Sequence, residues 1–323
     1  MAASLNDKIK QLIPITRVEF IPANSASVLI GFAWAIESNY SFDHKTIGLL
    51  LSLFVVLSAV GTLGAHWNSY SDYELDSDDP TKTELHKSLS GLGKITLKNI
   101  IRIEFALAAT IFLFFLFKHF DWNLLVIWIT AASLAFAYSM PPMRFKAKGL
   151  IAFISLCLVL SVLPILFIYL TIDQSPSKEF ILFLLGHTMV VYSLIIPTEI
   201  RDYVVDKSHQ VSTMTVWLGL KKAILFAQIL IVVGTFMIVS SYFRTDLFIE
   251  YPILSISLMV ILACNGFVFF KFNQLRKLIH SSPGNDISMN EVSDFAKDNP
   301  KWITISSVGS MVVALLYAIG KIY

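Results

Sequence analysis

Long uninterrupted apolar segments dominate the distribution of hydrophobic and polar residues along the chain. Each is long enough to cross the roughly 30 Å hydrocarbon core of a bilayer as an α-helix, and none alternates as a β-strand would. The pattern therefore predicts an all-α, polytopic membrane protein. We expect nine membrane-spanning helices, at about residues 17–37, 46–67, 97–117, 122–140, 150–172, 179–198, 221–243, 249–270 and 302–320.

The polar segment after the second predicted span carries regularly spaced oxygen-bearing side chains. Asn68, Asp72 and Asp76 lie four residues apart, and on a helix this spacing places them on one face. Three such side chains at a membrane boundary could hold a hard cation such as Mg²⁺, which would also offset the cost of the negative charge. By itself, this pattern fits a solvated acidic loop equally well.

A second acidic cluster follows the sixth predicted span. Asp202 and Asp206 repeat the spacing of four residues, and Glu199 comes three residues before Asp202. Two carboxylate clusters at helix ends can hold two cations around one strongly anionic ligand. A diphosphate is the natural candidate, because Mg²⁺ combines carboxylate with phosphate oxygens.

The two acidic clusters also indicate how the chain is organised. Four predicted spans separate Asp72 from Asp202. We therefore expect a single transmembrane domain over residues 1–323, built from two four-helix halves at about 15–149 and 150–270, with a ninth helix at about 302–320. Each half would contribute one acidic helix end to a shared cavity.

Composition and charge support a membrane location and indicate an orientation. Of the 323 residues, 55% are hydrophobic and 15% are charged, which excludes an ordinary soluble domain. With the N-terminus in the cytoplasm, the positive-inside rule accounts for all but five of the Lys and Arg residues. The exceptions are Lys45, Lys118, Lys178, Arg244 and Lys321. We expect an integral membrane protein, in the cell or inner membrane if the source is prokaryotic, whose N-terminus and active-site loops are cytoplasmic. The bilayer is an expected partner, and no nucleic acid partner is expected.

A basic loop lies between the two acidic clusters. It begins with Tyr138 and two prolines and continues with Arg144, Lys146 and Lys148. Standing alone, it would be interpreted as an ordinary positive-inside loop. Beside two acidic clusters it can bind the same diphosphate and stabilise the charge of a leaving group, and Lys207 could add a further contact.

Together these three segments resemble the UbiA superfamily of intramembrane prenyltransferases. The resemblance rests on the patterns Asn68-x3-Asp72-x3-Asp76, Tyr138-Ser-x-Pro-Pro-x-Arg144-x-Lys146 and Asp202-x3-Asp206-Lys207, in this order. It implies nine helices around a central cavity that opens to the lipid. It also implies that the protein uses Mg²⁺ to transfer a polyprenyl group from a polyprenyl diphosphate to a lipophilic or aromatic acceptor, as in quinone, lipid or carotenoid biosynthesis.

The patterns and the resemblance together give a set of expected site residues. The expected metal ligands are Asn68, Asp72, Asp76, Glu199, Asp202 and Asp206. The expected diphosphate ligands are Asn68, Lys82, Arg144, Lys146 and Lys207. The expected catalytic residues are Asp72, Tyr138, Arg144, Lys146 and Asp202, with the Tyr138 ring available to support an allylic cation. His66 lacks zinc-like spacing with a second ligand, so we interpret it as a loop or interface histidine.

One departure from the family pattern bears on the acceptor. The Arg-Pro segment that many members carry after the first acidic motif is absent between Asp78 and Gly91, where Lys82 or Lys87 would have to replace the arginine. Since arginine is the usual bidentate partner of a carboxylate, we expect a lipophilic acceptor and not 4-hydroxybenzoate.

Two alternative functions remain open at this stage. A terpene cyclase would use the same ionisation, with a double bond of the substrate as the acceptor. A cation-coupled transporter belongs to another class, and its binding site would lie near the middle of the membrane. The position of the carboxylates at helix ends, beside a basic loop, argues against transport.

Overall fold

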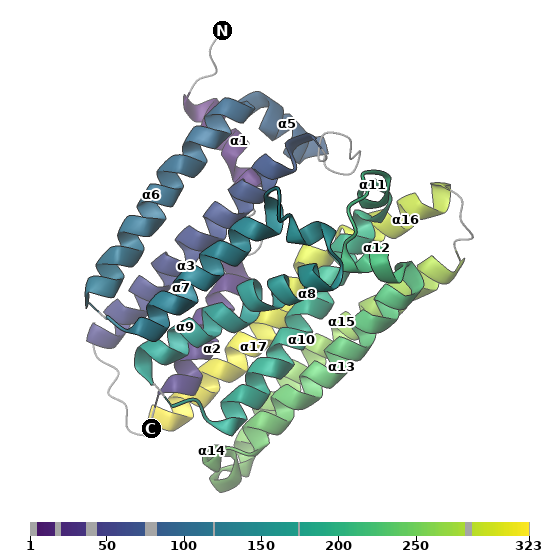
Figure 1. The fold of residues 1–323 in the computed structure, drawn as a ribbon. Coiled ribbons are helices and arrows are strands. Elements are labelled where there is room, and N and C mark those ends of the chain that lie inside the picture. The colour runs from purple at the N-terminus through teal and green to yellow at the C-terminus, as the bar shows by residue number, and fades with distance from the viewer. Residues whose placement is uncertain are drawn as a thin grey trace.

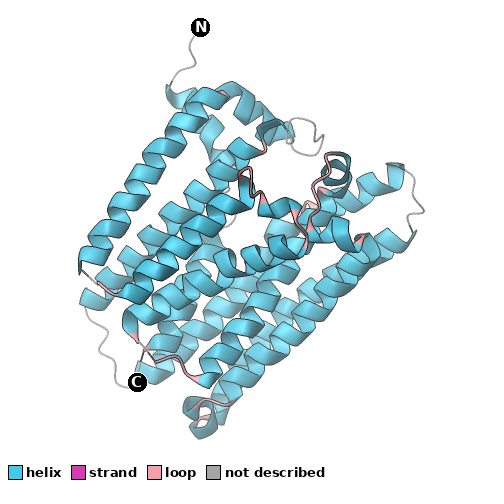
Figure 2. Ribbon diagram, viewed as in Figure 1, coloured by secondary structure: helices cyan, strands magenta, loops and turns pink. Residues whose placement is uncertain are grey.

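The computed structural model describes residues 5–16, 21–36, 44–74, 83–118, 120–173, 175–281 and 286–322. Across these residues the regular structure is helical, and the helices lie side by side as a bundle (Figures 1 and 2). The only pairing of β type within the described segments is an isolated bridge between Lys148 and Ser212. The predicted all-α class is confirmed.

In the first half of the chain, helices end at the first acidic segment and at the basic loop. The elements of this half are α1 (Leu5–Thr16), α2 (Ile21–Ala35), α3 (His44–Ser71), α5 (Thr83–Leu92), α6 (Lys94–Lys118), α7 (Trp122–Ser139), the short η3 (Phe145–Ala147), α8 (Leu150–Cys157), η4 (Leu158–Val162) and α9 (Leu163–Ile172). Helix α3 ends at the first acidic segment, and α7 ends at the basic loop.

The second half contains four long helices joined by short ones. Its elements are α10 (Lys178–Arg201), α11 (Tyr203–Ser208), α12 (Met214–Leu218), α13 (Leu220–Phe243), α14 (Asp246–Glu250), η5 (Pro252–Ser257), α15 (Leu258–Ser281), α16 (Asp286–Ala296) and α17 (Asn299–Ile322).

The lengths and surfaces of the helices fit a membrane. Among the described residues, eight helical segments are long and apolar enough to cross a bilayer, and nine if the bent pair formed by α1 and α2 is counted as one span. Large apolar side chains such as Phe114, Phe117 and Phe236 are exposed on the outside of the bundle, where lipid can cover them. The chain is therefore polytopic. The central lipid-open cavity and the division into two four-helix halves stay predictions.

Helix α10 is the most buried of these spans and packs closely on α13. Gly186 of α10 faces Gly234 of α13, and a Cβ atom added to Gly186 would lie 2.7 Å from the Gly234 carbonyl oxygen. Only glycine permits so close a helix contact. This contact sets the position of α10, whose last turn carries Glu199 and is followed directly by Asp202.

Candidate active site

The first acidic cluster continues the helical geometry of α3. The backbone N–H of Asp72 donates to the Asn68 carbonyl at 2.9 Å, so the two side chains share one helix face. The Asn68 Oδ1 accepts a hydrogen bond of 3.0 Å from the Ser139 hydroxyl, which ends α7. The Asp72 side chain is buried. Asp76 and Lys82 lie outside the described residues.

The basic loop places two cationic side chains close to Asp72. The chain leaves α7 through Pro141 and Pro142, and Arg144 then adopts a left-handed conformation with φ of 37°, which a side-chain-bearing residue rarely adopts and which is often found at functional sites. The Lys146 ammonium pairs directly with the Asp72 carboxylate, and the Arg144 Nη2 lies 4.0 Å from the same oxygen. Lys146 is buried, so the carboxylate is what makes its charge tolerable there.

In the second cluster, Glu199 is held by its surroundings. Its Oε1 accepts a hydrogen bond of 3.2 Å from the hydroxyl of Tyr192, which lies seven residues earlier in α10. Its Oε2 accepts one of 2.9 Å from the Thr215 backbone N–H of α12. Glu199 and Tyr192 are both buried. Glu199 thus links α10 to α12, and any metal at this carboxylate would share its oxygens with these two donors.

Asp202 and Asp206 lie one helical turn apart beyond α10. The Asp206 N–H donates to the Asp202 carbonyl at 2.9 Å. Arg201 approaches Asp202 in a bidentate manner, with its Nε 2.7 Å and its Nη2 3.1 Å from the two carboxylate oxygens. Asp206 is buried, whereas Lys207 is exposed and its ammonium lies 5.7 Å from the centre of the Tyr203 ring.

The basic loop connects the two clusters. The Gly149 N–H donates to the Ser212 carbonyl at 2.7 Å, and Lys148 and Ser212 form the isolated bridge. The loop that contacts Asp72 is therefore attached to the segment that follows Asp206, and both clusters lie at the same end of the bundle (Figure 1). Residues separated by more than a third of the chain are brought together in this way.

The oxygen donors of the two clusters suit a hard cation. The described residues contain no group of three or more His, Cys, Asp and Glu side chains arranged as a complete metal site. Asn68 with Asp72, and Asp202 with Asp206, each offer two oxygen-bearing side chains from one helical turn. Such a pair suits Mg²⁺, which keeps water and takes phosphate oxygens in addition to one or two carboxylates.

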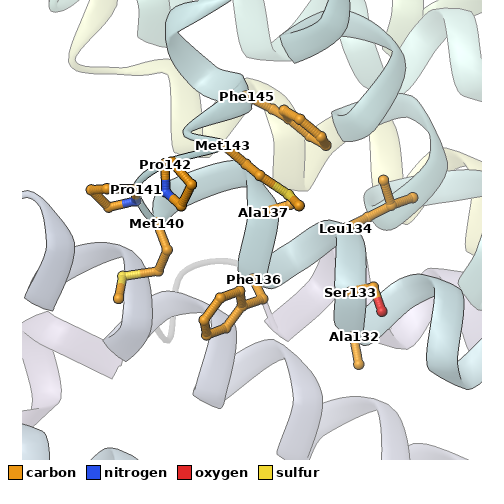
Figure 3. A pocket seen from close by; sticks show the side chains of 10 residues that line it. All are labelled: Ala132, Ser133, Leu134, Phe136, Ala137, Met140, Pro141, Pro142, Met143 and Phe145. Atoms are coloured by element: carbon orange, nitrogen blue, oxygen red, sulfur yellow. The ribbon is translucent and has the colours of Figure 1, made fainter.

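An apolar pocket is formed by the end of α7 and the basic loop (Figure 3). Met143 and Phe145 line it, while Arg144 and Lys146 reach Asp72. The pocket has a volume of about 590 Å³, and its remaining lining residues are Ala132, Ser133, Leu134, Phe136, Ala137, Met140, Pro141 and Pro142. Apolar pockets of this size accommodate hydrocarbon ligands, and the basic loop therefore contributes residues both to a charged site and to an apolar pocket.

Sequence reasoning missed several partners of the expected site residues. Ser139, which bonds Asn68, directly follows the half-buried Tyr138 in the basic motif, and Arg201 directly precedes Asp202. Adjacency in the sequence was a usable signal in both cases. The Thr215 contact uses a backbone amide, for which the sequence contains no signal.

The interpretation of His66 as a loop or interface histidine missed its packing against other helices. His66 is buried inside the bundle, with its Nδ1 2.8 Å from a Glu104 carboxylate oxygen and its Nε2 3.1 Å from the Thr16 hydroxyl oxygen. These contacts tie α3 to α6 and α1, directly behind the first acidic cluster. A carboxylate on a neighbouring helix makes burial of the imidazole favourable.

Known structures share this architecture. A UbiA homolog from Archaeoglobus fulgidus bound to GPP and Mg²⁺ is 17% identical, with a TM-score of 0.62 over 93% of this chain and 99% of that chain. A UbiA homolog from Aeropyrum pernix K1 is 13% identical, with a TM-score of 0.61 over 91% and 97%. A structure described for digeranylgeranylglyceryl phosphate synthase is 19% identical, with a TM-score of 0.56 over 98% and 99%. At these identities the similarity shows the fold.

Sequence comparison identifies the family. No curated protein matches the chain. The model of the UbiA prenyltransferase family, however, matches residues 25–278. This range includes both acidic clusters and the basic loop, and it spans most of the chain. The protein therefore belongs to the UbiA prenyltransferase family.

Proposed function

We propose that this enzyme uses Mg²⁺ to transfer a polyprenyl group from a polyprenyl diphosphate to a lipophilic or aromatic acceptor. The observation that carries the proposal is the position of Arg144 and Lys146 at Asp72, on a loop that is bonded to the segment after Asp206. Two cationic side chains between two oxygen-rich helix ends form a site for a diphosphate.

In this proposal the basic side chains bind the diphosphate and stabilise it as it leaves. Lys146 and Arg144 would shift part of their pairing from Asp72 to the phosphate oxygens, and Lys207, next to Asp206 on α11, would add a further contact. Asn68, Asp72, Asp202 and Asp206 would hold Mg²⁺, with Glu199 fixing the end of α10. When bound, Mg²⁺ supplies positive charge for the departing oxygens.

The reaction breaks the allylic C–O bond and leaves its electron pair on the diphosphate. A nucleophilic carbon or oxygen of the acceptor then bonds to the allylic carbon and loses a proton. The carbocationic carbon must be protected from water, and aromatic faces can support it. Tyr138 is the candidate for this role because it lies on α7, one residue before the hydroxyl that binds Asn68.

We propose further that the acceptor is lipophilic and not 4-hydroxybenzoate. The apolar pocket beside the basic loop supports this proposal, because it suits a hydrocarbon ligand at this end of the bundle. Two related structures carry names that concern prenyl substrates, one with bound GPP and Mg²⁺ and one described as a digeranylgeranylglyceryl phosphate synthase. The bias of Lys and Arg across the spans supports placing the N-terminus and the site on the cytoplasmic side.

Product analysis tests this function. The purified enzyme in lipid vesicles receives labelled geranylgeranyl diphosphate and Mg²⁺, with 4-hydroxybenzoate, a dihydroxynaphthoate, homogentisate, a carotenoid or a glycerol lipid as acceptor. We expect a prenylated product with a lipophilic acceptor and none with 4-hydroxybenzoate. A cyclic hydrocarbon formed without any acceptor would instead show a terpene cyclase.

A further inference from the structure

The helix that carries the second acidic cluster is weakened just before that cluster. Pro197 lies inside α10, two residues before Glu199. Proline has no backbone N–H, and its ring crowds the carbonyl group four residues earlier. The hydrogen bonds of α10 alone therefore leave the direction of its last turn poorly fixed, although this turn positions Glu199 and Asp202.

Asn299, the first residue of α17, spans this weak point. Its Nδ2 donates to the Leu194 carbonyl and to the Thr198 hydroxyl oxygen, each at 2.7 Å. The two acceptors lie on either side of Pro197 along α10. The carbonyl is only an acceptor, so the amide nitrogen must point toward α10. Asn299 is 1% exposed, and its bonds are therefore shielded from competing water.

Residues on both sides of Asn299, in α16 and at the start of α17, also contact the end of α10 or pack beside it. The Ser293 hydroxyl of α16 donates to the Arg201 carbonyl at 3.3 Å, at the last residue of α10. Trp302 of α17 packs against Phe295 of α16 and Phe272 of α15, with ring centroids 5.5 and 6.2 Å apart. Both α16 and α17 lie beyond residue 278, where the family match ends.

We propose that Asn299 is a positioning residue for the prenyl transfer. It fixes the last turn of α10 across Pro197, so that Asp202 and Asp206 keep their places opposite Asp72 and the basic loop. Asn299 bonds to Leu194 and Thr198, neither of which is among the expected site residues. This inference rests on the proposed function for its effect on turnover, but its structural part can be tested separately.

The chain offers a matched control in Asn265 of α15. This side chain is 3% exposed and, like that of Asn299, makes two hydrogen bonds to neighbouring helices. Its Nδ2 donates to Thr235 at 2.9 Å, and its Oδ1 accepts from Ser306 at 2.7 Å. Neither partner belongs to α10, so Asn265→Leu makes the same chemical change without touching the second acidic cluster.

The experiment compares Asn299→Leu with Asn265→Leu in thermal stability, amide hydrogen exchange of residues 198–208, and kcat and KM for geranylgeranyl diphosphate at several Mg²⁺ concentrations. We expect both variants to lose similar thermal stability. Only Asn299→Leu should exchange faster over residues 198–208, lose about tenfold or more in kcat/KM, and require more Mg²⁺. Asn299→Gln, which keeps the amide donor, should recover part of the loss.

Two results would overturn the proposal. One is unchanged exchange over residues 198–208 in Asn299→Leu, and the other is an equal loss of activity in both variants. If Asn299→Leu does not fold, Thr198→Val removes one of the two bonds and must show the same local increase in exchange. Faster local exchange in Asn299→Leu with no prenyl transfer by the unaltered enzyme would refute the proposed function. It would leave the structural part of the inference, that Asn299 fixes the last turn of α10, in place.

Discussion

The buried pair of Asp72 and Lys146 predicts a loss of stability that is separate from the loss of catalysis. The two side chains are 9% and 7% exposed, and their charged groups are in direct contact. Asp72→Asn would remove the carboxylate that is in direct contact with the buried Lys146 ammonium, with the Arg144 guanidinium nearby as a like charge. The protein should therefore unfold more easily, whatever Asp72 does for the substrate.

The size of the effect follows from the burial of the pair. Removing one partner of a buried ion pair costs about 3–5 kcal/mol. Arg144 is 37% exposed and can turn toward water, so its repulsion adds little and we expect the lower value. A loss of about 3 kcal/mol corresponds to a change on the order of 10² in the unfolding equilibrium. In Asp72→Asn/Lys146→Met neither charge remains, and most of the stability should return.

These free energies are measured by unfolding the protein in mixed micelles with increasing concentrations of a denaturing detergent. A prenyl transfer assay is run on the same samples. We expect the order of stability to be unaltered protein, double variant and then Asp72→Asn, with no transfer by either variant. Equal stability of Asp72→Asn and the unaltered protein would refute the buried pair. So would a double variant no more stable than Asp72→Asn.

Three further substitutions test other parts of the site and its scaffold. Arg144→Gln should raise the donor KM or lower kcat by on the order of tenfold, while correct insertion, checked by protease protection, shows that topology is unchanged. Tyr192→Phe removes the 3.2 Å bond to Glu199 and should lower the free energy of unfolding by about 1 kcal/mol, seen as a lower detergent midpoint. Gly186→Val would bring a Cβ to 2.7 Å from the Gly234 carbonyl and should abolish accumulation of folded protein in size-exclusion chromatography, whereas unchanged yield would show that α10 and α13 are not in close contact.

The membrane-spanning helices were predictable because hydropathy over some 20 residues is a strong local signal. The predicted span at 150–172 coincides with the continuous helical run of α8, η4 and α9. The last span was predicted too short, since α17 begins at Asn299. Polar residues at a helix start lower the local hydropathy without ending the helix.

The arrangement of the site was only partly predictable. Spacing alone indicated that Asn68 and Asp72 share a helix face. It could not indicate the left-handed conformation of Arg144 or the backbone contact of Glu199 with Thr215, because both depend on how distant helices pack. His66 shows the same limit, since its burial depends on a carboxylate from another helix. Contacts across the bundle therefore had to come from the structure.

The measurement that tests the central claim most directly is the fate of a labelled polyprenyl diphosphate in membranes that contain the enzyme and its lipids. With Mg²⁺, we predict release of inorganic diphosphate together with transfer of the label to a lipid-extractable product. EDTA, Asp72→Ala and Asp202→Ala should each stop both events, because the two acidic clusters act together on one diphosphate. Unchanged turnover in EDTA, or in either variant, would contradict a metal-dependent site formed by the two clusters.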